Sequence, residues 1–248
     1  MYPYVVNGIY ILSIIIPNTM LVIIIKKKEG LIMPRKPKNI AKLILIKKYA
    51  FAAVNLYGVI ELNDFVDVYN HYETDPLTSK EAVTVLELLA SIDGISMSFK
   101  QNILTNSLFY LDGRSEIEKA KDLLKIQSTK PKYLPLKDEF LKYEDDEYIE
   151  PMDCLMALYH FIKENKLVKI KPTYDIWYDI MVLHDQYMFD NQITYFMDYI
   201  EQRGYVFSNE SKKQVFTDLL LDIQNNTRMY TNNGYTPNEL KKLLEKTN

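Results

Sequence analysis

The chain holds few cysteines and histidines that could take part in nucleophilic catalysis. Its 248 residues include one cysteine, Cys154, and three histidines. Nucleophilic catalysis needs a serine, cysteine or threonine beside a histidine, but Cys154 and His160 fall on different azimuths of one predicted helix, more than a turn apart. A single cysteine also excludes a disulfide framework and a cysteine-rich zinc site within one chain. We therefore expect Cys154 to lie in a hydrophobic core.

Metal-dependent hydrolysis is the catalytic hypothesis for which ligands can be suggested. Asp153, His160 and His184 could come together from different helices, as ligands do in metal-binding bundles. Against this, the chain has no Glu-x-x-His or His-Glu-x-x-His motif, no glycine-rich phosphate loop and no dinucleotide fingerprint. We assign no catalytic residue, no metal ligand and no cofactor, and we expect His184 to lie on a helix surface.

Five lysines raise DNA binding as another function. Three of them, Lys42, Lys47 and Lys48, lie in the most basic part of the chain, and Lys80 and Lys100 complete the set. A duplex-binding protein usually carries a marked basic excess. Here 30 Lys and Arg are outnumbered by 33 Asp and Glu, for a net charge of -3. DNA binding is therefore an alternative rather than the main hypothesis.

The elements that would present these lysines follow from the spacing of apolar residues. With 48% apolar residues and only 7 glycines, the composition is that of a globular protein rich in helix. Three- and four-residue spacing predicts helices over 41–55, 62–72 and 79–90. Alternation predicts a hairpin with strands at 95–99 and 103–110. This order predicts a winged-helix-like unit, whose third helix would enter the major groove.

A stretch with two prolines, residues 128–135, marks the predicted domain boundary, because each proline restricts its own backbone and that of the preceding residue. Residues 33–132 form the predicted winged-helix-like unit, which also includes a helix at 115–126. Residues 133–248 form a predicted helical domain with helices at 152–164, 173–187, 192–203, 209–226 and 237–246. The predicted fold class is mainly α, with the winged-helix-like unit followed by a helical bundle.

Two features of the second half could belong to a binding surface. Acidic residues concentrate over 138–150, where no glycine-centred calcium-loop spacing occurs, so we expect a solvated helix end and loop. Aromatic residues concentrate over 174–207, and exposed aromatic side chains would form an adhesive surface. Tyr174, Trp177 and Tyr178 fit one helix face, so we expect most of these residues in the core.

The first segment, residues 1–32, is apolar and needs a separate interpretation. Residues 4–25 carry no charge and precede three lysines, Lys26 to Lys28. About 20 apolar residues are enough to cross a bilayer. One interpretation is therefore a membrane anchor that leaves the rest of the protein in the cytoplasm, and another is a buried helix. The favoured one is a mis-called start: Lys28-Glu29-Gly30 can be encoded by a purine-rich ribosome-binding sequence upstream of Met33. A membrane partner follows only if residues 4–25 are translated and inserted.

The sequence from 226 to 239 predicts a tight corner between two helices. Thr236 and Glu239 have the spacing of a capping box, with a proline in the first helical position. Asn232-Asn233-Gly234 supplies residues that accept left-handed backbone geometry. We expect a structural helix corner formed by Asn226, Arg228, Asn233, Gly234, Thr236, Pro237 and Glu239.

Residues 225–240 resemble a segment of uncharacterised proteins from low-GC Gram-positive bacteria, their phages and mobile elements, many of which carry a cysteine-rich, zinc-binding SEC-C tail. Lys130-Pro131-Lys132-Tyr133-Leu134-Pro135, with Phe140 to Tyr143, resembles another segment of that group, so the likeness runs from about residue 57 to 240. This chain has no Cys-x-Cys pair, so the zinc is not carried over. The resemblance implies a bacterial or phage origin in the cytoplasm and no particular activity.

The function that we expect is non-enzymatic recognition of a macromolecule, with another protein as the partner, in the regulation of a bacterial or mobile-element process. One alternative is a DNA-binding transcription regulator that uses the five lysines. The other is the metal-dependent hydrolase. The sequence leaves the oligomeric state open.

Overall fold

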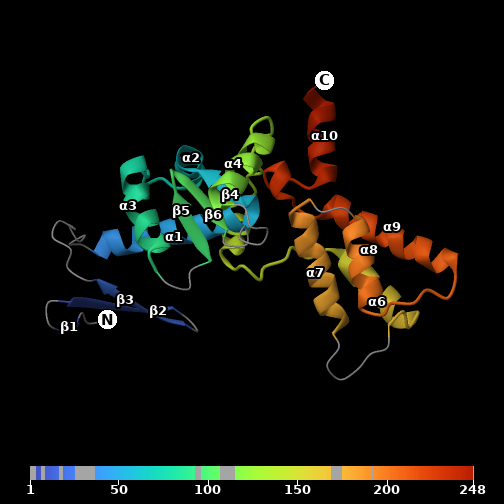
Figure 1. Cartoon of the computed structure of the whole chain (residues 1–248). Helices are drawn as coiled ribbons and strands as arrows, with labels where there is room; N and C mark the ends of the chain where they lie inside the picture. Colours follow the sequence, from blue (N-terminus) through green and yellow to red (C-terminus); the bar gives the residue numbers. More distant parts are fainter. Residues whose placement is uncertain are drawn as a thin grey trace. The chain divides into compact units, whose positions relative to one another are not determined.

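The computed structural model describes residues 4–6, 9–16, 19–25, 37–92, 96–106, 115–168, 175–190 and 193–247. The chain divides into two compact units, residues 1–42 and 43–248. Helices predominate in the described residues, as the sequence predicts (Figure 1).

The first unit contains a three-stranded antiparallel sheet in the order β1-β2-β3. Its strands are β1 (Tyr4–Val6), β2 (Ile9–Ile16) and β3 (Thr19–Ile25). Isoleucine and valine dominate these strands and favour extended backbone. The described residues between 4 and 25 are therefore strands, and not the helix that the membrane-anchor and buried-helix interpretations need. Within the described parts of the chain, no helix is both long and apolar enough to cross a bilayer. The start at Met33 stays a prediction.

The second unit opens with helices wrapped around a small sheet. The elements in order are α1 (Pro37–Tyr57, which begins in the first unit), β4 (Val59–Glu61), α2 (Leu62–Tyr72), α3 (Ser79–Ala90), β5 (Met97–Lys100) and β6 (Ile103–Asn106). The three strands are antiparallel in the order β4-β6-β5, so β6 is central. The outer part of the predicted returning strand, 107–110, lies outside the described residues.

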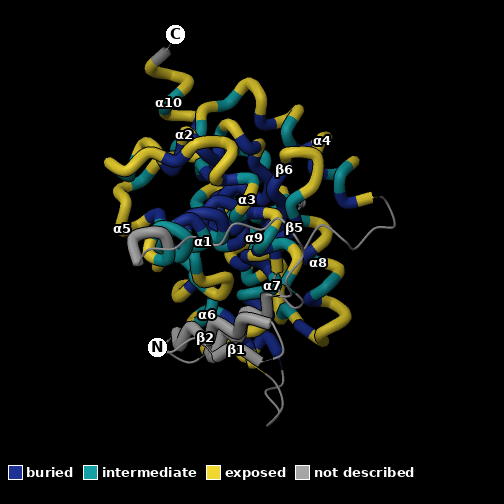
Figure 2. Tube along the Cα trace, turned by 90° about the vertical axis from the view of Figure 1, so that its left-hand side faces the viewer, coloured by how far each residue is buried: buried dark blue, intermediate teal, exposed yellow. Residues whose placement is uncertain are grey.

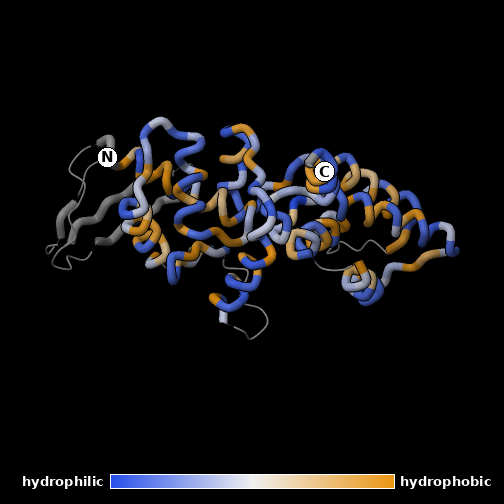
Figure 3. Tube along the Cα trace, turned by 90° about the horizontal axis from the view of Figure 1, so that it is seen from above, coloured by the Kyte–Doolittle hydropathy of each residue, from blue (hydrophilic) through white to orange (hydrophobic). Residues whose placement is uncertain are grey.

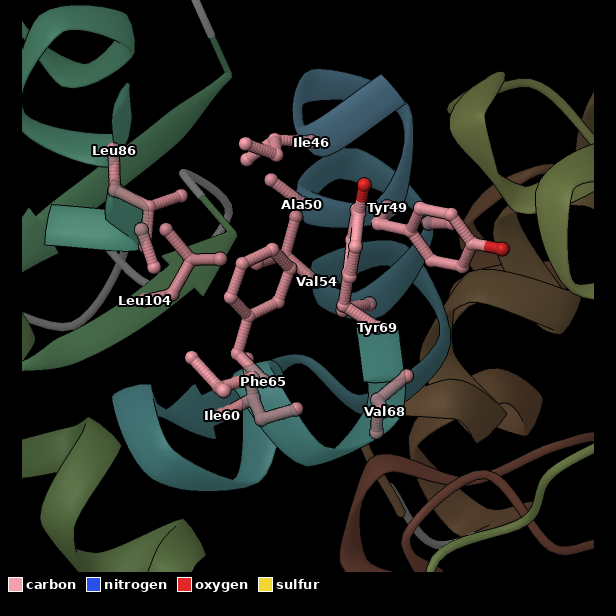
Figure 4. Packing of buried hydrophobic residues seen from close by; sticks show 14 of the residues in the cluster. Ile46, Tyr49, Ala50, Val54, Ile60, Phe65, Val68, Tyr69, Leu86 and Leu104 are labelled. Atoms are coloured by element: carbon pink, nitrogen blue, oxygen red, sulfur yellow. The ribbon is translucent and has the colours of Figure 1, made fainter. Parts of the chain in front are cut away.

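Helix α1 is the centre of the first hydrophobic core. The C-terminal half of its trace is largely buried (Figure 2). Tyr49, Ala50, Ala53 and Val54 recur there at helical spacing and are fully buried. In Figure 4, side chains of α1 meet Phe65 of α2 and residues of α3 and β6.

The β5–β6 hairpin turns through two residues, because Lys100 pairs with Ile103 in the strand register. Gln101 and Asn102 have φ values of 52° and 62°, the left-handed geometry that two-residue hairpin turns of this kind require. Helix α4 (Glu116–Gln127) contacts β4 and β6.

The remaining elements form a helical assembly with its own core. They are α5 (Lys137–Phe140), the 3₁₀ helix η2 (Leu141–Glu144), α6 (Asp153–Glu164), α7 (Ile176–Met188), α8 (Ile193–Gln202), α9 (Glu210–Asn226), the 3₁₀ helix η3 (Tyr230–Asn232) and α10 (Pro237–Thr247). Helix α6 packs against α7 and α9, and α7 packs against α8 and α9. Apolar and polar residues alternate along these helices (Figure 3), as expected for helices with one buried face.

Two aromatic residues link the first core to the chain that follows the predicted boundary at 132. Phe140 of α5 and Tyr143 of η2 are buried in the core centred on α1. The boundary itself stays a prediction, but the packing of residues 43–143 is continuous across it.

Candidate functional site

Three of the five lysines suggested for DNA binding are engaged in ion pairs. The Nζ atoms of Lys47 and Lys48 lie 3.8 and 2.9 Å from the carboxylate of Glu144. The Nζ of Lys100 lies 2.9 Å from Oε2 of Glu116, a buried residue on α4 that also accepts hydrogen bonds from Ser98 and Thr105. These pairings reduce the positive charge offered to phosphates along α1 and the hairpin.

The two other lysines lie in different surroundings. Lys80 is exposed on α3, whose solvent face also carries Glu81 and Glu87, and Lys42 is half-buried on α1. Helix α3 therefore presents more negative than positive side chains on its exposed face. These surroundings do not favour phosphate contacts, and DNA binding stays a prediction.

The side chains suggested for metal chemistry are spread over two helices. Asp153 and His160 are exposed on α6, whereas Cys154 is buried and burial raises the pKa of its thiol. His184, expected on a surface, is only 7% exposed on α7 because its helix face packs inward. Among the residues that the structure describes, no three His, Cys, Asp or Glu side chains are grouped closely enough to hold a metal ion.

The helix corner after α9 is built around one arginine. Arg228 is 9% exposed. Its Nε donates to Oε1 of Glu150 at 2.9 Å, and its Nη1 donates to Oε2 of Glu239 at 2.8 Å and to the Gly234 carbonyl at 3.0 Å. The guanidinium carbon also lies 3.7 Å from the ring centre of Tyr133, a cation–π arrangement.

The charges around Arg228 explain why it stays protonated in a buried position. Burial disfavours the charged form, but Tyr143, Glu150 and Glu239 together raise the pKa of the guanidinium above its ordinary value. Tyr143 accepts a hydrogen bond from Arg228 Nε and donates one to Glu150. The hydrogen bonds and ion pairs of Arg228 therefore connect the helix corner to Tyr143 and Glu150, which follow α5.

The capping box lies in the same cluster. The Thr236 amide donates to Oε2 of Glu239 at 3.1 Å, and the Glu239 amide donates to Oγ1 of Thr236 at 3.1 Å. Asn226 at the end of α9 accepts a hydrogen bond from Asn238 in the first turn of α10, next to Pro237. These contacts fix the direction in which α10 leaves the corner.

Residues 227–236, here called the return segment, lie against α1 and α4. Asn233, in left-handed geometry, donates to the Gln127 and Lys130 carbonyls at 3.0 and 2.7 Å. Gln127 in turn donates to the carbonyls of Tyr57 and Tyr230 at 2.8 and 2.7 Å. The amide groups of Asn233 and Gln127 therefore tie the return segment to α1 and α4, although the side-chain oxygen of each is buried without a hydrogen-bond partner among the described residues.

A groove of about 640 Å³ lies between the loop after η2 and one face of α7. The loop contributes Asp145, Asp146 and Glu147, all exposed, and α7 contributes Asp185. No lysine or arginine occurs among the described residues that line the groove. We call this feature the acidic groove.

Aromatic and thioether side chains form much of the remaining wall of the acidic groove. Trp177 and Tyr178, at the start of α7, are 36% and 59% exposed. Met181 and Met188 follow on the same helix. Polarizable methionine and aromatic side chains beside carboxylates are typical of surfaces that bind a partner.

One buried polar atom of the acidic groove lacks a hydrogen bond. Nδ1 of His184 has no hydrogen-bond partner among the described residues, and its nearest charged neighbour is Oδ1 of Asp185 at 3.6 Å. A buried polar group without a partner costs free energy, so such a group in the wall of a groove indicates a missing donor or acceptor.

The chain matches no family model, no curated protein and no solved structure. The resemblance to uncharacterised bacterial and mobile-element proteins therefore stays a prediction.

Sequence reasoning found both walls of the acidic groove without finding the groove. The acidic run at 138–150 and the aromatic residues of α7 were each visible, but the first was interpreted as solvated and the second mainly as core. Tyr187, Phe196 and Tyr205 are buried as expected, whereas Trp177 and Tyr178 are not. The missing information is the tertiary contact that brings residues 145–147 next to α7.

Proposed function

We propose that this protein is a non-enzymatic recognition protein that binds another protein through the acidic groove. The observation that carries the proposal is a groove with four carboxylates, exposed aromatic side chains and no described cation. With the resemblance of residues 225–240, the setting we propose is regulation in the cytoplasm of a bacterium or in a mobile element.

The finer architecture belongs to the same proposal. The order α1-β4-α2-α3-β5-β6 and the strand order β4-β6-β5 support a winged-helix-like unit, followed by a helical bundle. Such folds serve many functions, so the architecture alone does not select one. The paired lysines and the acidic exposed face of α3 favour a protein contact for this unit.

DNA binding is the second candidate, because a winged-helix-like topology supports it. Titration of the chain with duplex DNA at low and at physiological salt tests it. Tight binding that weakens steeply with salt, and that is lost in Lys47→Glu with Lys48→Glu, would make DNA the favoured partner. No binding of duplex DNA at low salt would exclude DNA binding. Metal-dependent hydrolysis has no specific observation in its favour.

Site-specific photocrosslinking tests the proposed groove. A photoreactive phenylalanine analogue replaces Tyr178, which is 59% exposed in the acidic groove, or Tyr195, which is 63% exposed on α8 outside it. In lysate of the source cells, we expect a discrete crosslinked protein from position 178 and none from position 195. Equal products at both positions, or no product from position 178, would refute the proposal.

A further inference from the structure

The charge of the acidic groove restricts what can occupy it. The side chains of Asp146 and Glu147 are exposed and have no ion-pair or hydrogen-bond partner among the described residues. Adjacent carboxylates repel each other, and a cationic ligand would relieve that repulsion. A phosphate-rich ligand would increase it, which disfavours nucleic acid in this groove.

The aromatic side chains indicate which cation fits. Trp177 and Tyr178 offer exposed ring surface beside the carboxylates. An ammonium or guanidinium group over such a ring gains a cation–π contribution, and arginine is the side chain most often found there. The combination of ring and carboxylate therefore matches a lysine or arginine side chain.

The length of the acidic groove indicates a chain segment and not a single small cation. The lining residues of α7 run from Trp177 to Met188, which at the helical rise corresponds to about 16 Å. An extended peptide of about five residues covers that distance. A free amino acid or a single amine would leave most of this wall uncovered.

His184 supplies a second observation, which concerns a buried polar atom and not an exposed carboxylate. Its side chain is more than nine-tenths buried, lines the acidic groove, and leaves Nδ1 without a hydrogen bond in the described structure. Depending on its tautomer, this nitrogen accepts from a backbone N–H or donates to a backbone C=O, and an extended segment offers both groups.

We infer that the acidic groove binds an extended, arginine- or lysine-bearing segment of a partner protein, with the cation held between the Trp177–Tyr178 rings and the carboxylates of residues 145–147. The inference rests on the proposed function and specifies the chemistry of the partner. A segment with a basic residue at every second position would place its cations on the face toward the carboxylates.

Fluorescence anisotropy with a defined peptide tests the inference on the full chain. The probe is fluorescein-labelled Gly-Arg-Gly-Arg-Gly-Arg-Gly, and the control peptide carries citrulline, the uncharged analogue of arginine, at the same positions. We expect saturable binding of the arginine peptide at low salt and at least tenfold weaker binding of the citrulline peptide. Equal binding of the two peptides, or no binding of either, would overturn the inference.

Matched variants locate the binding. Asp146→Asn with Glu147→Gln should weaken binding of the arginine peptide about tenfold. Glu61→Gln with Asp67→Asn makes the same change in net charge at exposed residues outside the acidic groove, so it should leave binding within about twofold. Trp177→Leu should weaken binding about threefold through loss of the cation–π contribution. Equal effects of the two charge-neutralising pairs would show a nonspecific attraction and refute the site.

Two outcomes separate this inference from the proposed function. If the arginine peptide does not bind but the crosslink at position 178 persists, the groove binds a protein of different chemistry and only the inference fails. If both are absent, the proposed function fails as well. Argininamide that binds as tightly as the peptide would identify a small-cation site and overturn the inference.

Discussion

Replacing Arg228 by methionine should destabilise the protein by about 3–4 kcal/mol. The two carboxylate partners, Glu150 and Glu239, are 29% and 38% exposed in their side chains, so water can partly replace the arginine, and each lost pair costs about 0.5–1 kcal/mol. The Gly234 carbonyl loses its donor, at about 1 kcal/mol. Loss of the cation–π contact with Tyr133 adds about 1 kcal/mol.

Urea denaturation followed by circular dichroism measures this effect. With a denaturant dependence of about 3 kcal/mol per molar, Arg228→Met should lower the midpoint by about 1 M. Arg228→Lys keeps the charge but loses the forked donor geometry, so it should lie between the wild type and Arg228→Met. In the control Lys142→Gln, which removes the exposed i,i+3 pair with Glu139, the midpoint should not change.

Two results would refute the reasoning about Arg228. A midpoint for Arg228→Met within about 0.2 M of the wild type, well below the about 1 M shift expected, would mean that the corner does not depend on the guanidinium. A loss of similar size in Lys142→Gln would mean that the measurement reports net charge and not the buried contacts of Arg228.

Glycine substitutions and alkaline pH give further tests. Gly58→Ala should cost about 2–4 kcal/mol in a urea titration, because φ is 73° and the new Cβ would lie 2.7 Å from Cγ of Tyr230. Gly204→Ala has a similar φ of 83° and open space, so it should cost only about 1 kcal/mol, and equal losses would contradict the packing argument. Burial raises the pKa of Tyr69 and Tyr72 to about 12, so these hydroxyls ionise first in the unfolded chain. Stability should therefore fall as pH rises above about 10, and a constant urea midpoint up to about pH 12 would exclude this contribution.

The helices could be predicted because their apolar spacing is regular. The range 62–72 matches α2 at both ends, and the third helix ends at Ala90 as predicted. Its cap, Thr78, forms reciprocal hydrogen bonds with Glu81, an arrangement that follows from local spacing. The mainly helical class follows from such local signals.

Two parts of the fold could not be predicted because their signals are short or ambiguous. Strand β4 has three residues, too few to show alternation, and it is defined only by its pairing with β6. The apolar run at 4–25 has the length of a membrane helix and the composition of strands, so its length alone does not select between helix and strand.

The candidate site was harder to predict than the fold. Its acidic wall comes from the loop between η2 and α6, and its aromatic wall comes from α7. These two segments are separated along the chain. A histidine without a metal-ligand motif is predicted on a helix surface, and only the packing shows that His184 is buried.

The return segment also has a consequence for folding during synthesis. Gln127 hydrogen-bonds the carbonyl of Tyr230, 103 residues later, and at the same time that of Tyr57 in α1. At about 5–20 residues per second, a ribosome needs about 5–20 s to make the intervening chain. During that interval α1 and α4 lack the residues that finally cover them, so the nascent protein exposes apolar surface around Val59 and Ala120. A chaperone that binds nascent chains would therefore have this apolar surface to bind until the return segment is synthesised and packs against α1 and α4.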